Sequence, residues 1–280
     1  MQIIIAKTAG FCFGVKRALE LVQDALKSKQ TPIYSLGPLI HNPGVVKELS
    51  DNGLNVITEL KDINTGRVVI RSHGVGPQIY KKALANNLEI IDATCPFVKN
   101  VQQLAILLKE QCYQVIIVGE KDHAEVKGVL DSIDGDALVV NDVTELDSEK
   151  IAPKIGIISQ TTQDIENFQK IVTEIISYSK EIRIFNTICS ATLQRQQEVA
   201  ELSTQVQLMI VVGGKNSANT NRLAEISRNN KCLTYQVESP DELQKDWFNN
   251  VKIVGVTAGA STPDQQINLV VDRINHLGGN

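Results

Sequence analysis

The chain has 280 residues and a formal net charge of −4, with acidic and basic residues interspersed along it. Because no basic stripe or acidic tail stands out, we expect a small-molecule partner and no nucleic acid. No apolar run reaches the roughly 18 residues of a membrane span, and the run at residues 2–5 is too short for a secretion signal. We therefore expect a cytoplasmic protein with no membrane partner.

Apolar runs alternate with helical patterns along the whole chain. The first helix is predicted over residues 15–27, where apolar side chains recur three and four positions apart. Strands are predicted in the apolar run before Cys12 and at residues 33–36, 68–70, 89–92, 115–118, 155–158, 182–185, 208–212, 233–235 and 253–256. Further helices are predicted at residues 45–49, from 96 to about 110, at 126–132, from about 164, after 189, and from near 221 and 263. Strands that are apolar throughout are typical of parallel sheets covered on both faces, so the pattern predicts an α/β fold.

A cysteine recurs three times at the end of a predicted strand and the start of a predicted helix. These residues are Cys12, Cys95 and Cys189. Equivalent points of repeated units can converge about a pseudo-threefold axis, and three converging thiolates would form a metal site. We therefore expect three α/β units, spanning residues 13–95, residues 96–189, and residues 1–12 together with 190–280.

The composition favours thiols that serve metals or catalysis over a disulfide framework. Five cysteines without close-spaced pairs fit a reducing compartment. Cys112 and Cys232 lack the strand-end context, so we expect both to be buried core thiols. A structural zinc site usually has four protein ligands, including a close-spaced pair such as C-x-x-C. This chain lacks such a pair, which favours iron and sulfide over zinc. Three thiolates would leave one iron of a [4Fe–4S] cluster open to act as a Lewis acid on a substrate oxygen.

Three of the four histidines lie in loops at predicted strand ends. They are His41, His73 and His123, whereas His276 lies in the last predicted helix. Such loops precede helix N-termini that favour anions, so imidazoles there would donate hydrogen bonds to an anionic ligand. Glu125 is either a proton source beside that ligand or a first-turn helix acid.

Short polar side chains occupy the remaining strand-end loops. Residues 213–217 are glycine-rich but lack the spacing of a nucleotide P-loop, which we exclude. Ser217, Asn219 and Ser261 offer donors to an anion, and capping of the following helices is the competing interpretation. Thr161 and Thr162 either cap the helix from about residue 164 or bind a substrate hydroxyl near the metal.

Several of these loops together resemble the 4-hydroxy-3-methylbut-2-enyl diphosphate reductase family, over the whole chain. The matching segments are residues 9–15, 37–42, 71–75, 92–96, 159–162, 215–217 and 257–261. The resemblance implies a trefoil of three pseudo-threefold-related α/β units, each with a small mostly parallel sheet, around a central cavity. It also implies a [4Fe–4S] cluster with three cysteine ligands and one open iron, and two-electron reductive dehydroxylation of the allylic diphosphate. The products would be isopentenyl and dimethylallyl diphosphates, and the electron donor would be ferredoxin or flavodoxin.

The resemblance also assigns roles to individual residues. The cluster ligands fall on Cys12, Cys95 and Cys189. The diphosphate contacts fall on His41, His73, His123, Ser217, Asn219 and Ser261. The proton donor falls on Glu125, and Thr161 matches the threonine that touches the substrate hydroxyl, with Gln160 alongside it. Ala218 departs from the family, which often has a serine there, so we expect weaker or rerouted phosphate binding at that point.

Two other classes of function compete with the reductase. A zinc hydrolase or deaminase would use the H-x-E pattern at residues 123–125, but the P-C-x-x-C partner motif is missing. A non-catalytic redox sensor would hold a cluster but would leave the three loop histidines and residues 217–219 unexplained. A visible iron–sulfur spectrum separates the first alternative from the reductase, and binding of a diphosphate separates the second.

Overall fold

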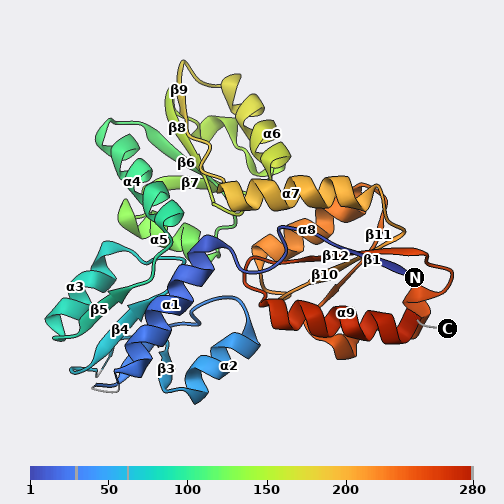
Figure 1. The fold of residues 1–280 in the computed structure, drawn as a ribbon. Coiled ribbons are helices and arrows are strands. Elements are labelled where there is room, and N and C mark those ends of the chain that lie inside the picture. The colour runs from blue at the N-terminus through green and yellow to red at the C-terminus, as the bar shows by residue number, and fades with distance from the viewer. Residues whose placement is uncertain (29–30, 62, 279–280) are drawn as a thin grey trace. The chain divides into compact units, whose positions relative to one another are not determined.

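The computed structural model describes residues 1–28, 31–61 and 63–278, and these residues form three four-stranded sheets with parallel neighbours (Figure 1). The first sheet contains β2 (Ile33–Leu36), β3 (Leu54–Ile57), β4 (Arg67–Ile70) and β5 (Glu89–Asp92). The second contains β6 (Gln114–Val118), β7 (Ala137–Val140), β8 (Lys154–Ser159) and β9 (Glu181–Ile184). The third contains β10 (Leu208–Val212), β11 (Leu233–Val237), β12 (Ile253–Ala258) and β1 (Gln2–Ile5). The predicted α/β class, with three small parallel sheets, is confirmed.

The three sheets share one strand order. The orders are β3-β2-β4-β5, β7-β6-β8-β9 and β11-β10-β12-β1. Across each sheet, the second strand of the repeat in sequence is therefore followed by the first, the third and the fourth. In the third sheet the fourth place is taken by β1, the first strand of the chain. The repeat is therefore cyclically permuted, and β1 is equivalent to β5 and β9.

Helices follow most of the strands, as parallel connections require. They are α1 (Phe13–Lys27), α2 (Pro43–Asp51), α3 (Pro77–Ala85), α4 (Pro96–Glu110), α5 (Ala124–Ser132), α6 (Ile165–Ile176), α7 (Ser190–Ser203), α8 (Ala218–Asn229) and α9 (Asp264–Gly278). The helix predicted from near Asn221 begins three residues earlier, because the Ser217 side chain caps its first turn by accepting a hydrogen bond from the Thr220 N–H. No helix among these described residues combines the length and apolar character needed to cross a membrane.

The chain divides into two compact units. Unit 1 comprises Met1–Val15, His41–Gly44 and Ser190–Asn280, and unit 2 comprises Lys16–Ile40 and Val45–Cys189. Unit 1 contains the third sheet, and unit 2 contains the first and second sheets. The strands of each sheet lie within one of the three predicted ranges, and the bounds of those ranges stay a prediction.

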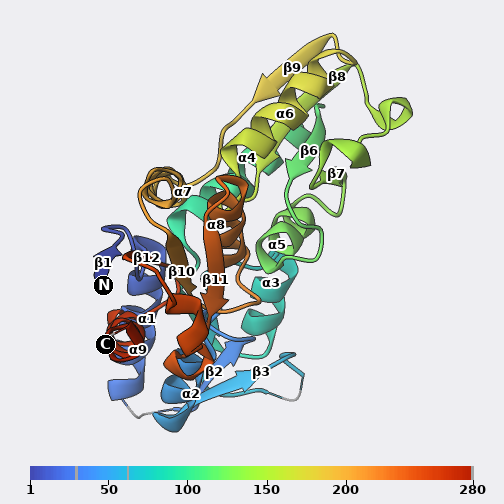
Figure 2. The same ribbon diagram turned by 90° about the vertical axis from the view of Figure 1, so that its right-hand side faces the viewer.

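The sheet of unit 1 is covered on both faces. Along β10, Leu208, Ile210 and Val212 share a core with the buried side chains of α9, namely Ile267, Val270 and Ile274. The alternate residues Met209 and Val211 share a second core with side chains of α7 and α8, namely Val199, Leu202, Leu223 and Ala224. Because successive strand residues point to opposite faces, this division shows α9 on one face and α7 with α8 on the other (Figure 2). That two-sided burial explains why β10 is apolar at every position.

In unit 2, α4 and α5 pack against one face of the second sheet. The core of the second sheet combines Val115 and Ile117 of β6 with side chains of α4 and α5. A Cβ on Gly156 of β8 would lie 2.3 Å from a methyl carbon of Leu108, so glycine lets α4 approach this strand closely.

The two cysteines outside the strand-end pattern differ in burial. Cys232 is buried, as predicted, and burial raises the pKa of its thiol. The prediction for Cys112 is wrong, because its side chain is exposed. Cys112 lies past the end of α4 in a left-handed turn with φ of 58°, and this turn carries the side chain out of the apolar helix face.

Candidate functional site

The three strand-end cysteines occupy equivalent positions in their sheets. Each lies between the fourth strand of its sheet and a helix that begins at the next residue, namely α1, α4 or α7. The N–H of Cys12 donates to the Ala260 carbonyl over 3.1 Å. The N–H groups of Cys95 and Cys189 donate over 3.0 Å to the carbonyls of Ser72 and Thr161. Ala260, Ser72 and Thr161 are each the second residue after the third strand of the sheet, so one backbone contact is repeated three times.

The surroundings of these cysteines suit thiolate ligands. All three are half-buried and none forms a disulfide. A helix N-terminus next to a cysteine favours the thiolate, the form that binds metals.

Two side chains of α7 fix the loop before Cys12 in unit 1. The Glu198 carboxylate accepts hydrogen bonds from the Lys7 N–H over 2.6 Å and from the Thr8 N–H over 2.8 Å. It also accepts one from the Thr8 hydroxyl over 2.6 Å. Burial opposes ionisation of Glu198, but the hydrogen bonds from Thr8 and Lys7 outweigh it and lower the pKa of this carboxyl. The buried Arg195 guanidinium donates to the Gly10 carbonyl over 2.6 Å.

In unit 2, charged groups brace the loop before Cys95. The Arg17 guanidinium donates to the Thr94 carbonyl over 3.2 Å. The Asp92 carboxylate accepts from the Thr94 N–H over 3.0 Å and forms a 2.6 Å ion pair with Lys99. Burial opposes ionisation of Asp92, but the bonds from Lys99 and Thr94 prevail and lower its pKa. The thiol-bearing loops in both units are therefore held by ionised side chains rather than by apolar packing alone.

Glu125 and Thr161 form a buried pair in unit 2. One carboxylate oxygen of Glu125 accepts from the Thr161 N–H and the other accepts from the Thr161 hydroxyl, both over 2.7 Å. The Glu125 side chain is only 2% exposed. Burial raises the pKa of Glu125 from 4.5 to about 7, and the two hydrogen bonds from Thr161 limit that rise. A carboxyl with this pKa can hold and release a proton near neutral pH.

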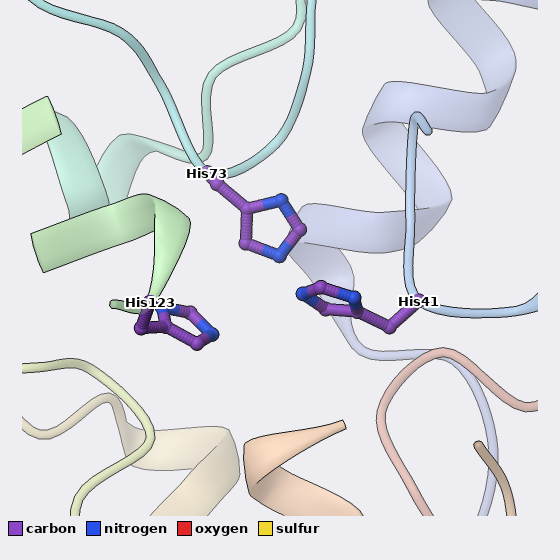
Figure 3. A group of neighbouring side chains, drawn as sticks. All are labelled: His41, His73 and His123. Carbon is purple, nitrogen blue, oxygen red and sulfur yellow. The ribbon is translucent and has the colours of Figure 1, made fainter. Parts of the chain in front are cut away.

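His73 and His123 face one another in unit 2, at the ends of β4 and β6 (Figure 3). Their ring centroids lie 5.6 Å apart with the planes at 79°. The Nδ1 atom of His123 accepts a hydrogen bond from the Glu125 N–H over 3.2 Å and thereby caps α5. In neutral His123 the proton therefore resides on Nε2, which can act as a donor. His123 thus caps a helix and offers a donor at the same time.

The other predicted anion contacts lie in unit 1. The Ser261 hydroxyl donates to the backbone carbonyl of His41 over 3.1 Å, which ties the loop after β12 to residues 41–44. Asn219 lies in the first turn of α8, is 5% exposed, and has neither a donor nor an acceptor for its side-chain amide among the described residues. A buried amide without partners is costly unless a ligand satisfies it. Ala218 is the first residue of α8, where only its backbone N–H is available to an anion.

The structure thus brings some predicted residues together within each unit. Glu125 lies with Thr161, and His73 lies with His123. Gln160, predicted as a supporting group, accepts from the Glu120 N–H and donates to the Thr162 hydroxyl, so it joins the loops after β6 and β8. The convergence of the three cysteines, and the substrate contacts of the other site residues, stay predictions.

Sequence reasoning missed the residues that support the cysteine loops. Glu198 and Arg195 lie about halfway along α7 and contact residues 190 and 185 positions away in the chain. Nothing in the local pattern around residues 195–198 distinguishes them from ordinary polar residues of a helix. Only the folded structure shows that the buried Arg195 and the half-buried Glu198 contact the loop before Cys12.

Comparison with known proteins gives one consistent result. Residues 3–275 match the family model of the LytB protein. A 4-hydroxy-3-methylbut-2-enyl diphosphate reductase from Syntrophotalea carbinolica is 47% identical over 278 residues, which cover 99% of this chain and 99% of the relative. The Aquifex aeolicus protein of the same name is 44% identical over 282 residues, covering 99% of this chain and 97% of that protein.

Solved structures agree with these sequence relatives. A structure of (E)-4-hydroxy-3-methyl-but-2-enyl diphosphate reductase, the terminal enzyme of the non-mevalonate pathway, is 43% identical and has a TM-score of 0.72. It covers 99% of this chain and 100% of its own. The Plasmodium falciparum E-1-hydroxy-2-methyl-but-2-enyl-4-diphosphate reductase is 29% identical with a TM-score of 0.91, covering 98% of this chain and 88% of its own.

Proposed function

This chain belongs to the family of 4-hydroxy-3-methylbut-2-enyl diphosphate reductases, and from that membership we propose which of its residues carry out the reaction. It is an oxidoreductase of isoprenoid biosynthesis that converts the allylic diphosphate to isopentenyl and dimethylallyl diphosphates. In each turnover the C–O bond to the hydroxyl breaks, two electrons and two protons enter, and the hydroxyl leaves as water. Family membership therefore favours the reductase over the zinc hydrolase and the redox sensor.

The family is one of iron–sulfur enzymes, and we propose Cys12, Cys95 and Cys189 as the ligands of a [4Fe–4S] cluster. Three half-buried thiols, each at a helix N-terminus and each with the same backbone hydrogen bond, fit such a ligand set. When bound, the cluster would supply the reducing electrons and one iron without a protein ligand.

We propose that Glu125 provides the proton that leaves with the hydroxyl as water. The observation that carries this assignment is the buried pair in which both oxygens of Glu125 meet Thr161. Protonated Glu125 would donate to the Thr161 hydroxyl, which would in turn donate to the substrate hydroxyl oxygen. A pKa of about 7 keeps a substantial fraction of Glu125 protonated at neutral pH, which suits a general acid.

We propose six residues as the contacts of the diphosphate. His73 and His123 would contribute imidazole N–H groups, and His41 would contribute a third. Ser217, Asn219 and Ser261 would contribute hydroxyl and amide donors at the ends of β10 and β12. The amide of Asn219 supports this role, because it is buried and has no partner among the described residues.

The electron donor and the compartment are part of the same proposal. A cluster of this kind accepts electrons one at a time, so ferredoxin or flavodoxin is the proposed donor. Five free cysteines suit a reducing cytoplasm, where thiols stay reduced. Turnover with reduced ferredoxin or flavodoxin, measured against NADPH alone, tests the donor.

The Glu125→Gln substitution tests the proton assignment. Glutamine keeps the size of the side chain but carries no titratable proton, so we expect turnover to fall by roughly 10²–10⁴-fold while cluster content and substrate binding are retained. The measurement is anaerobic steady-state turnover of the allylic diphosphate with a chemical reductant, with iron, sulfide and the visible spectrum determined on the same preparation. Near-normal turnover in a fully loaded variant would leave Glu125 only a helix first-turn acid.

A further inference from the structure

Arg71, the first residue after β4, is a half-buried cation that forms no ion pair with a carboxylate of the described residues. Its Nε atom is buried and has no hydrogen-bond acceptor among the described residues. Burial lowers the pKa of Arg71. The guanidinium nevertheless stays charged at neutral pH, because arginine is not deprotonated in proteins.

Arg67, at the start of the same strand, is a buried arginine whose Nε does have an acceptor. Arg67 is buried, and its Nε donates to the Thr31 hydroxyl over 3.1 Å. Removing a cation from water without a counter-ion or acceptors is unfavourable, and an anionic ligand is one way to offset that cost. Arginine also presents a planar set of donors that matches phosphate oxygens.

The position of Arg71 places this charge at the loops proposed to bind the substrate. Arg71 is two residues before His73, and β4 pairs with β2 in parallel, so the loops after both strands lie at one edge of the sheet. Gly37, the first residue after β2, has φ of +78°, and a Cβ there would lie 2.9 Å from Nη1 of Arg71. Ser72 donates its hydroxyl to the Leu39 carbonyl over 3.3 Å. The guanidinium therefore lies against the backbone of the loop after β2.

We propose that Arg71 is a specificity-determining cation for the diphosphate. The negative charge of the bound diphosphate would serve as the counter-ion of this guanidinium. The inference rests on the proposed function, in which the substrate is a diphosphate. A partly buried charge is screened weakly by salt and acts through low-dielectric surroundings, so it favours binding of the anion even without direct contact. Arg71 then selects for the charged end of the substrate, whereas Glu125 acts on the hydroxyl end.

The test compares substitutions that remove the charge or keep it. Arg71→Met keeps much of the apolar stem and removes the charge, and Arg71→Lys keeps the charge. Arg273→Met is the matched control, because Arg273 is an exposed cation on α9 and no role in the site is proposed for it. The cluster-loaded proteins are prepared anaerobically. The measurements are the Kd of inorganic diphosphate by titration calorimetry at low and high salt, and KM and kcat with the allylic diphosphate.

For Arg71→Met we expect about a ten-fold rise in KM and in the Kd of inorganic diphosphate, with a smaller change in kcat. We also expect this loss of diphosphate affinity to be similar at low and high salt, since a partly buried charge is screened only weakly. For Arg71→Lys we expect both constants to stay within about three-fold of the unsubstituted enzyme, because the positive charge is kept, and the control should be unchanged.

Two results would overturn the inference. One is unchanged diphosphate affinity in Arg71→Met. The other is an equal loss of affinity in the methionine and lysine variants together with an equal fall in melting temperature, which indicates a purely structural role. If Arg71→Met does not fold, the folded lysine variant decides the question, because a ten-fold loss of affinity there contradicts a charge-based role. If the unsubstituted enzyme neither binds diphosphate nor reduces the allylic diphosphate, the proposed function itself fails.

Discussion

At the scale of single residues, burial of Glu125 has two effects. It raises the pKa of the carboxyl, and it makes the folded protein less stable when this carboxyl is ionised. Its carboxyl is almost fully buried, and the two hydrogen bonds from Thr161 favour the ionised form. Desolvation is the larger effect, so the pKa rises to about 7. The same burial that prepares Glu125 to deliver a proton also makes its ionised form unfavourable in the folded protein.

This pKa predicts a pH-dependent contribution to stability. The folded-state pKa lies above the unfolded value, so the folded protein is favoured while Glu125 stays protonated, and this contribution is lost as pH rises through about 7. Glu125→Gln removes the titration. Between about pH 5.5 and about pH 8, we expect the stability of the unsubstituted protein relative to the variant to fall by about 2 kcal/mol. Melting temperatures of both proteins at the two pH values measure it. A difference in melting temperature that does not change with pH would show that Glu125 does not titrate in this range.

At the scale of elements, α7 has two roles in unit 1. It packs in the apolar core of the sheet, and its polar side chains hold the loop before Cys12. One side of the helix contributes Val199 and Leu202 to the apolar core against β10. Glu198 and Arg195 extend from the same helix to the backbone of Thr8 and Gly10. In the chain, this helix begins at the residue after Cys189, another proposed ligand.

Glu198→Gln is predicted to loosen the Cys12 loop. Glutamine offers one acceptor oxygen in place of two, so at least one of the donors from Lys7 and Thr8 loses its partner. We expect a stability loss of about 1 kcal/mol, because the side chain is partly solvated, and faster decay of the cluster's visible absorption when a chelator is added. Glu201→Gln is the control, since it removes an exposed carboxylate from the same helix. Equal decay rates in both variants would show that Glu198 does not support the loop.

The elements also show how far sequence patterns predict the fold and the site. Strands such as β10 were predicted to the residue, because burial on both faces makes them apolar throughout. β3 and β7 were not predicted, although each has four residues like β2, β5 and β9, which were. In the site, the strand-end positions of the cysteines and histidines follow from the repeat. The contacts of Glu198 and the lack of an ion pair at Arg71 among the described residues depend on tertiary neighbours, so no local pattern reveals them.

At the scale of the whole molecule, cyclic permutation of one repeat explains why one of the three proposed ligands, Cys12, lies near the start of the chain. β1 takes the place in its sheet that β5 and β9 take in theirs. Cys12, the first proposed ligand, therefore follows β1, although its sheet is otherwise built from β10, β11 and β12.

The first and third strands of each sheet also end in equivalent loops. His41, His123 and Ser217 each lie five residues after a first strand, and His73, Thr162 and Ser261 each lie three residues after a third strand.

This equivalence predicts the outcome of substituting each cysteine by serine. Cys12, Cys95 and Cys189 share one position in three copies of a sheet and one backbone hydrogen bond, so no one of them is a secondary ligand. We expect each single substitution to remove most of the iron and sulfide, and to do so to a similar extent. Cys112→Ser, at an exposed turn, and Cys232→Ser, in the core of unit 1, serve as controls and should retain the cluster. Iron and sulfide per chain, with the visible spectrum of protein purified without oxygen, give the measurement. Equal iron content in all five variants would refute the ligand assignment, and full retention in one of the three would show that the repeats are not equivalent in metal binding.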